Sequence, residues 1–187
     1  MKKQPEQTAR TRQKMINTFW ELAEKQGLDN VTISAITKKS GLNRGTFYVY
    51  FQNMDDLLEQ AEDDIICDLR AKIRTAVDEG GFNNFETVFP KIIDIYAMYD
   101  DKLFIMLGKH GDPYFYDKIK AEVSSSFREI FSQSQYLENI EYITAYVTSG
   151  LIGLLTYWHD TGKKISIVEL TKIVHSFLTE RLLGMMT

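Results

Sequence analysis

The sequence contains very little cysteine and proline, and each scarcity excludes a class of fold. A single cysteine, Cys67, among 187 residues can form neither an intramolecular disulfide nor a cysteine-based metal cluster. Only three prolines occur, and no run alternates Val, Ile or Thr with polar residues, which argues against a sheet-rich fold. We therefore expect an all-α protein of a reducing compartment, the cytoplasm, that holds no metal and no cofactor.

Long apolar runs are missing as well. No stretch approaches the roughly 20 apolar residues that span a bilayer, and no early run is typical of a signal peptide. A hydrophobic content of 44% with 26% charged residues is ordinary for a globular chain that buries a core. We expect no association with a membrane.

The charge of the chain is unevenly distributed. The net charge is −4, yet residues 1–52 hold nine Lys or Arg against four acidic residues. Residues 53–187 hold 13 basic against 22 acidic residues. A basic head on an acidic body fits a phosphate-binding module attached to a part that does not touch DNA. Chance variation in surface charge is the simpler explanation, and the asymmetry alone does not exclude it.

Residues 32–51 predict two short helices with a tight corner between them. Thr32 is a suitable N-cap, because its hydroxyl can accept a free N–H of the first turn. Ser40 and Gly41 end this helix, since glycine adopts the left-handed conformation of a C-cap without steric cost. Asn43 then caps a second helix. This is a helix-turn-helix pattern, in which the second helix lies in the DNA major groove.

The rest of the chain also shows helical periodicity. A supporting helix is expected over residues 10–26, after a frayed arm at 1–9, and a long helix over 53–78. Further helices are expected at 84–99, 101–109, 114–134, 137–161 and 166–184. The sequence thus predicts about nine helices, with a helix-turn-helix domain at 1–52 and a helical domain at 53–187.

The helix-turn-helix region also resembles a known family. Its fixed spacings are those of Ser40-Gly41-Leu42, Arg44-Gly45-Thr46-Phe47-Tyr48, Tyr50-Phe51 and Asp56-Leu57-Leu58. This order resembles the DNA-binding signature of TetR-type transcriptional regulators over about the first third of the chain. The remainder agrees with that family in length and helical character. The resemblance implies a homodimer on palindromic operator DNA, most often a repressor, with a small-molecule effector bound in the C-terminal domain.

The first set of candidate residues would contact DNA. It comprises Thr32, Lys38, Lys39, Asn43, Arg44, Gly45, Thr46, Tyr48 and Tyr50. Arginine can bind guanine bidentately, whereas Thr and Tyr hydroxyls more often bind phosphate. Lys38 and Lys39 are read equally well as solvated surface lysines. At Met54 the family commonly has a phosphate-binding lysine, for which Gln52 and Asn53 would have to substitute.

A second set would line an effector pocket. It comprises Tyr96, Tyr99, Phe104, Met106, His110, Phe127 and Tyr146. Aromatic residues and methionine at helical spacing more often form ordinary core, but the resemblance implies a pocket among these helices. The polar tips of Tyr96, Tyr99, His110 and Tyr146 would supply its few orienting hydrogen bonds.

A third set lies on two apolar bands of the last two helices. It comprises Tyr142, Tyr146, Gly150, Leu154, Trp158, Ile173 and Phe177. Such bands can be internal core, but the family uses them for a four-helix bundle between two subunits. The glycine-containing run that ends at Trp158 further resembles a subgroup of these regulators.

Two other functions stay open at this stage. One is a DNA-binding adaptor whose body binds a protein partner, which an exposed apolar patch away from the dimer surface, with no cavity, would favour. The other is an enzyme, for which the sequence offers little support. His110, His159 and His175 are scattered, with no metal-ligand spacing, and Cys67 is most simply a packed thiol.

Overall fold

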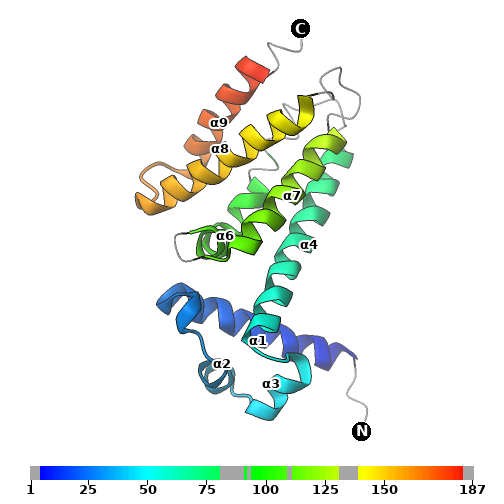
Figure 1. The fold of residues 1–187 in the computed structure, drawn as a ribbon, viewed down its shortest axis with the longest axis vertical. Coiled ribbons are helices and arrows are strands. Elements are labelled where there is room, and N and C mark those ends of the chain that lie inside the picture. The colour runs from blue at the N-terminus through cyan, green and yellow to red at the C-terminus, as the bar shows by residue number, and fades with distance from the viewer. Residues whose placement is uncertain (1–4, 81–90, 92–93, 109–110, 131–138, 183–187) are drawn as a thin grey trace.

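The computed structural model describes residues 5–80, 91, 94–108, 111–130 and 139–182, and these residues confirm the all-α fold (Figure 1). The described helices are α1 (Pro5–Gln26), the 3-10 helix η1 (Leu28–Asn30), α2 (Ile33–Ser40), α3 (Arg44–Tyr50), α4 (Met54–Gly80), α6 (Asp100–Leu107), α7 (Pro113–Ile130), α8 (Ile140–Asp160) and α9 (Ile167–Leu182). Within this part of the chain there is no strand. None of these helices is long and apolar enough to cross a lipid bilayer.

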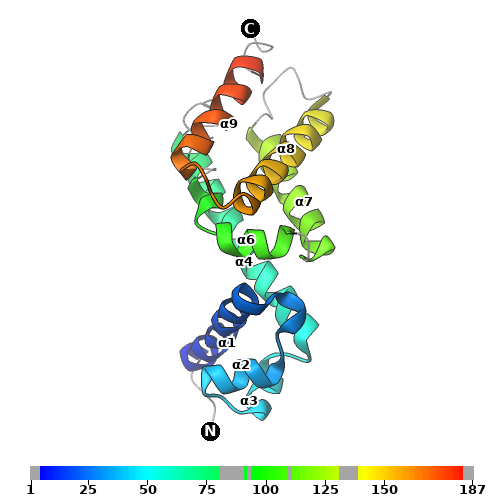
Figure 2. The same ribbon diagram turned by 90° about the vertical axis from the view of Figure 1, so that its left-hand side faces the viewer.

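The helices form a head and a body joined by one long helix. Helices α1 to α3 make the head at the N-terminal end, and α6 to α9 make the body at the other (Figure 1). Turned by 90°, the molecule shows a narrow waist at which α4 passes from one part to the other (Figure 2).

The apolar core of the molecule extends into the head, where it holds α2 and α3 in place. Phe19 of α1, Ile36 of α2 and Phe47 of α3 are almost completely buried there, as is Phe51 at the end of α3. Helix α1 begins at Pro5, so the expected arm over residues 5–9 is helix instead. A proline suits this first position, because its fixed φ is already helical and its missing N–H would be unpaired anyway.

Helix α4 is bound to both parts. Near its start, Arg12 of α1 donates to Gln60 Oε1 at 2.9 Å and to Asp64 Oδ2 at 2.7 Å. Further along, Arg70 makes a fork to Glu122 of α7, with N–O distances of 2.5 to 3.0 Å. Cys67, expected to be packed, is exposed on this helix.

Helix α6 makes a second contact between the body and the head. It packs against α1, α7 and α8, and Lys102 Nζ lies 5.8 Å from the ring centre of Trp20 in α1. The helices expected at 101–109, 114–134, 137–161 and 166–184 correspond to α6, α7, α8 and α9. Most of the helix expected at 84–99 lies outside the described residues.

Candidate nucleic-acid interface and body cavity

The corner between α2 and α3 has the local geometry that the sequence predicts. Thr32 Oγ1 accepts a hydrogen bond from the Ala35 amide at 3.2 Å. Gly41 has φ +66°, and its N–H closes the end of α2 on the Lys38 carbonyl. Asn43 Oδ1 accepts from the Thr46 amide at 2.7 Å and from the Thr46 hydroxyl at 3.0 Å. The start of α3 is therefore rigidly capped.

The outer face of α3 presents a cation beside an aromatic hydroxyl. Arg44 is exposed; its Nη2 donates to the Tyr48 hydroxyl at 3.2 Å, and its guanidinium carbon lies 5.8 Å from that ring's centre. Phe47, next to Tyr48, is fully buried and packs edge-on against it at 5.6 Å. The buried ring anchors the helix, so that Arg44 and Tyr48 are held outward at its first turns.

Two lysines flank this face, and they differ in their partners. Lys38 is exposed at the end of α2. Lys39 Nζ forms an ion pair with Glu21 Oε2 of α1 at 2.8 Å, and this hydrogen bond and charge lower the pKa of the Glu21 carboxyl. Lys39 would have to leave Glu21, or share it, in order to bind a phosphate.

Two other candidates, and two residues at the start of α4, have structural roles in the head. The hydroxyl oxygen of Tyr50 is buried and its ring packs against the core, so its expected DNA contact is corrected. A Cβ at Gly45 would lie 3.3 Å from Asn43 Oδ1, so glycine protects the cap as well as leaving space outside. Met54 is half-buried against the core, which explains why an apolar residue replaces the family's usual lysine. Asn53 Oδ1 accepts from the Asp56 amide at 2.8 Å as the cap of α4.

Two small neighbouring cavities lie in the body between α6, α7 and α8. The larger has a volume of about 40 Å³ and the smaller about 30 Å³. Both are lined by Tyr96, Leu103, Leu107 and Leu155, which form their common wall. The larger cavity is otherwise walled by α7 and α8, and the smaller extends to Asp100 and His159.

Two residues that line the larger cavity carry buried hydroxyls that the described residues do not satisfy. The Tyr96 hydroxyl and Thr148 Oγ1 are both buried, and neither has a hydrogen-bond partner within that part of the chain. Burial, together with the negative charge of Glu122, raises the pKa of the Tyr96 phenol, so it stays a neutral donor. Buried polar groups are normally paired, and this pair requires an explanation.

The predicted pocket residues divide into three groups. Tyr96 and Phe104 line the cavities. Met106 is buried in the core and lines neither cavity. Tyr99 also lines neither cavity, and its hydroxyl donates to Asp68 of α4. Tyr146 is 79% exposed on the outer face of α8. These three predictions are therefore corrected. His110 and the side chain of Phe127 lie outside the described residues.

The sequence analysis missed most of the actual lining. Leu103, Leu107, Leu151 and Leu155 contribute the greater part of it, together with Thr148. Leucines at helical spacing look the same in a sequence whether they face a core or a cavity. The threonine within an apolar band was the one available signal.

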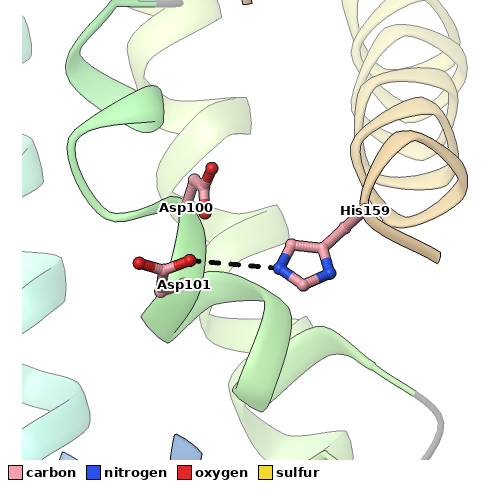
Figure 3. Close-up of side chains that lie close together, drawn as sticks. All are labelled: Asp100, Asp101 and His159. Carbon is pink, nitrogen blue, oxygen red and sulfur yellow. Dashed lines mark ion pairs between the residues drawn. The ribbon is translucent and has the colours of Figure 1, made fainter. Parts of the chain in front are cut away.

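The mouth of the smaller cavity carries a charged cluster (Figure 3). Asp100 and Asp101 begin α6 and face His159 at the end of α8, and His159 Nε2 lies 4.0 Å from Asp101 Oδ1. Although these three side chains have the spacing of metal ligands, Lys163 Nζ lies 2.7 Å from Asp100 and 3.2 Å from Asp101. A lysine thus already supplies the positive charge, and it fastens the turn after α8 to α6.

An aromatic face lies on the outside of α8 and α9. Tyr142, Tyr146 and Tyr157 of α8 and Phe177 of α9 are between 68% and 79% exposed, and Ile173 of α9 is exposed as well. A Cβ at Gly150 or at Gly153 would meet no atom within 4 Å, so the middle of α8 is open to close approach.

Two residues expected on that face lie inward. Trp158 is buried, and its Nε1 donates to the Ile165 carbonyl at 2.7 Å, so its assignment to a dimer surface is corrected. Leu154 is half-buried against the core. Tyr157, at helical spacing from Tyr142 and Tyr146, takes the position on the outer face that the sequence analysis gave to Trp158.

The fold and the head together define a class of protein, an all-α DNA-binding protein of the helix-turn-helix type. Residues 16–61 match the family model described as bacterial regulatory proteins of the tetR family. Residues 83–180, more than half of the chain, match the model of a transcriptional regulator C-terminal region. The chain belongs to the TetR family of bacterial transcriptional regulators, a family that binds operator DNA and forms dimers.

Relatives support the same assignment. The chain is 29% identical over 108 residues to YvdT and 28% identical over 156 residues to YxbF, both HTH-type transcriptional regulators of Bacillus subtilis. These alignments cover 58% and 82% of the chain but only 51% and 40% of the two relatives. The chain thus matches about half or less of their length.

Solved structures share the fold at low identity. FadR of Bacillus halodurans, described as a regulator of fatty acid degradation, superposes with a TM-score of 0.78 at 20% identity, over 97% of this chain and 98% of that one. A protein of Syntrophomonas wolfei assigned to the TetR family gives a TM-score of 0.74 at 20% identity, over 90% and 93% of the two chains.

Proposed function

We propose that this TetR-family regulator is a homodimeric repressor that binds a palindromic operator through α2 and α3 and releases it when a small molecule enters the body. The observation that carries the proposal is the exposed Arg44 and Tyr48 pair on the first turns of a capped helix. The two parts correspond to residues 1–52 and 53–187, with the start of α4 shared between them.

The head has the chemistry that DNA recognition requires. Arg44 can present two N–H donors to a guanine edge, while the Tyr48 and Thr32 hydroxyls are suited to phosphate oxygens. Lys38 adds an exposed positive charge beside them. The excess of basic residues in the head and of acidic residues in the body would orient the head toward DNA.

The aromatic face of α8 and α9 supports pairing with a second copy. Monomeric proteins rarely leave large apolar patches exposed, and large aromatic side chains dominate many interfaces. Two copies packed through these helices would form a four-helix bundle. A two-fold axis there would present two α3 helices to half-sites about 34 Å or a multiple of it apart.

The body cavities support a small-molecule effector, whereas the adaptor alternative would be favoured by a body without a cavity and with an exposed apolar patch away from the dimer surface. The present volumes are far below the roughly 300 Å³ of typical ligand sites, so a ligand must separate α6 from α8. Because α6 also contacts α1, this opening would act on the head. Ligand would then favour the dimer shape that meets the two half-sites less well. We assign the chain no catalytic step.

The proposal is tested by titrating the protein with DNA from upstream of its own gene at two salt concentrations. Sequence-selective binding that weakens steeply with salt is expected. Arg44→Ala should weaken it by about tenfold or more, the range of one lost bidentate base contact. Arg128→Ala, which removes an exposed cation of the body, is the matched control and should bind normally. If Arg44→Ala bound the operator as tightly as the parent, Arg44 would not be a DNA contact.

A further inference from the structure

We propose that the cavity takes a neutral ligand with a medium-length apolar chain and one carbonyl oxygen, which accepts hydrogen bonds from both Tyr96 and Thr148. This inference rests on the proposed effector role of the cavity. It goes beyond that role by giving the chemical class of the ligand.

The first argument comes from the two hydroxyls. Both are buried donors without a partner in the described chain, and they belong to two residues that line the same cavity, so a shift of these side chains would bring both hydroxyls to one ligand. A carbonyl oxygen has two lone pairs, so a single such atom can accept from both donors. The rest of the larger cavity is apolar, which suits a hydrocarbon chain and leaves few other groups to orient it.

The second argument comes from the charges around the cavity. No described residue that lines the larger cavity is charged, so a carboxylate or an ammonium would be buried there without a counter-ion. The nearest charges offer no counter-ion to an anion, because Glu122 and Asp100 are carboxylates and are already paired with Arg70 and Lys163. A cationic group gains nothing at Asp100 and Asp101, since Lys163 already binds both. A neutral ligand is therefore selected.

The third argument comes from the shape of the space. The two cavities share a wall of three leucines and Tyr96, and each has room for only a few water molecules. Rotation of these side chains would join the cavities into one elongated space between α6 and α8. An extended chain fits such a space better than a compact ring system.

The test compares three probes with the same eight-carbon chain: 2-octanone, octanoate and octylamine. At pH 7.5 the acid is an anion and the amine a cation, so the three differ in the charge of the polar end. Each is added to the full-length protein at equal concentration, and the unfolding temperature is measured at fixed protein concentration. A ligand that binds only the folded state raises it. We expect 2-octanone to raise it and the two charged probes to leave it unchanged.

Three variants test the hydrogen bonds. Thr148→Val and Tyr96→Phe remove the hydroxyls with little change of shape, and each should weaken 2-octanone binding about three- to tenfold. Without ligand, neither should lower the unfolding temperature, because neither hydroxyl is paired in the described chain. Thr144→Val is the matched control: Thr144 is buried one turn earlier on α8 and does not line the cavity, so this variant should keep the affinity.

The outcomes separate this inference from the proposed function. Octanoate or octylamine binding as tightly as 2-octanone would overturn the neutral class, and equal losses in Thr148→Val and Thr144→Val would overturn the hydrogen bonds. No stabilisation by 2-octanone, with selective operator binding intact, would overturn the inference alone and leave a buried water as the partner of the hydroxyls. Stabilisation without any operator binding would support the inference and refute the proposed function.

Discussion

Replacement of Glu62 by glutamine should change how the stability of the protein depends on pH. Glu62 lies on α4 and is almost completely buried where that helix packs against α7. Lys118 Nζ lies 3.0 Å from one of its oxygens, but the other has no hydrogen-bond partner within the described residues. Burial raises the pKa of this carboxyl to about 7; Lys118 partly opposes the shift, and the nearby Asp112 adds to it.

The sign and the size of the effect follow from that pKa. Between pH 4.5 and about 7 the folded chain holds a proton on Glu62 that the unfolded chain has lost. Stability therefore falls as the pH rises through this range, and the loss is complete above the folded pKa. A shift of about 2.5 units at about 1.4 kcal/mol per unit gives a ceiling of about 3.5 kcal/mol. Glu62→Gln, which stays neutral, should remove this contribution.

The assay is urea unfolding of the parent and of Glu62→Gln at pH 5, 6, 7 and 8, at fixed protein concentration. Relative to the parent, the free energy of unfolding of the variant should rise by up to about 2.5 kcal/mol between pH 5 and pH 8. Asp63→Asn is the matched control, because Asp63 binds the same lysine at 2.9 Å but is exposed. A free-energy difference between Glu62→Gln and the parent that stays constant with pH would refute the reasoning.

Two further predictions concern the corner of the head and the outer face of the body. Gly41→Ala should destabilise the fold by about 1 to 2 kcal/mol, because alanine is strained at the φ of +66° that this position has. No atom lies within 4 Å of the added Cβ, so the cost is conformational and not steric. A urea midpoint equal to that of the parent would contradict this. Phe177→Asp should convert the dimer to monomer in sedimentation equilibrium, since it places a charge on the exposed aromatic face. Tyr114→Asp, on an equally exposed ring of α7, should leave the mass unchanged, and a dimer that survives Phe177→Asp would exclude this face as the interface.

The helix-turn-helix could be predicted because its signals are local. Thr32, Gly41 and Asn43 are cap residues whose roles depend on the few residues around them, and each takes the expected role. The inward direction of Phe47 and Phe51 follows from helical spacing in the same way. Helix caps and turns of this kind can therefore be predicted from a single sequence.

The body was harder to predict because its helices are apolar on more than one side. On α8, Tyr146 and Trp158 both belong to apolar bands, yet one is exposed and the other buried. Which band faces inward depends on where α6 and α7 lie, and periodicity does not contain that information. The corrections at Tyr99, Met106 and Tyr50 have the same cause. The position of each side chain is set by contacts with residues that are distant in the sequence.

Helix α4 runs without a break from the head into the body, so it can act as a lever. The segment between the Arg70 fork and Met54 is about 24 Å long at about 1.5 Å per residue. A rigid tilt of about 5° at the fork would displace the head by roughly 2 Å, and in a two-fold dimer the heads would part or approach by roughly 4 Å. That is about a tenth of the spacing of about 34 Å between half-sites one turn apart. A rearrangement in the body smaller than one side chain can thus become a misfit on DNA.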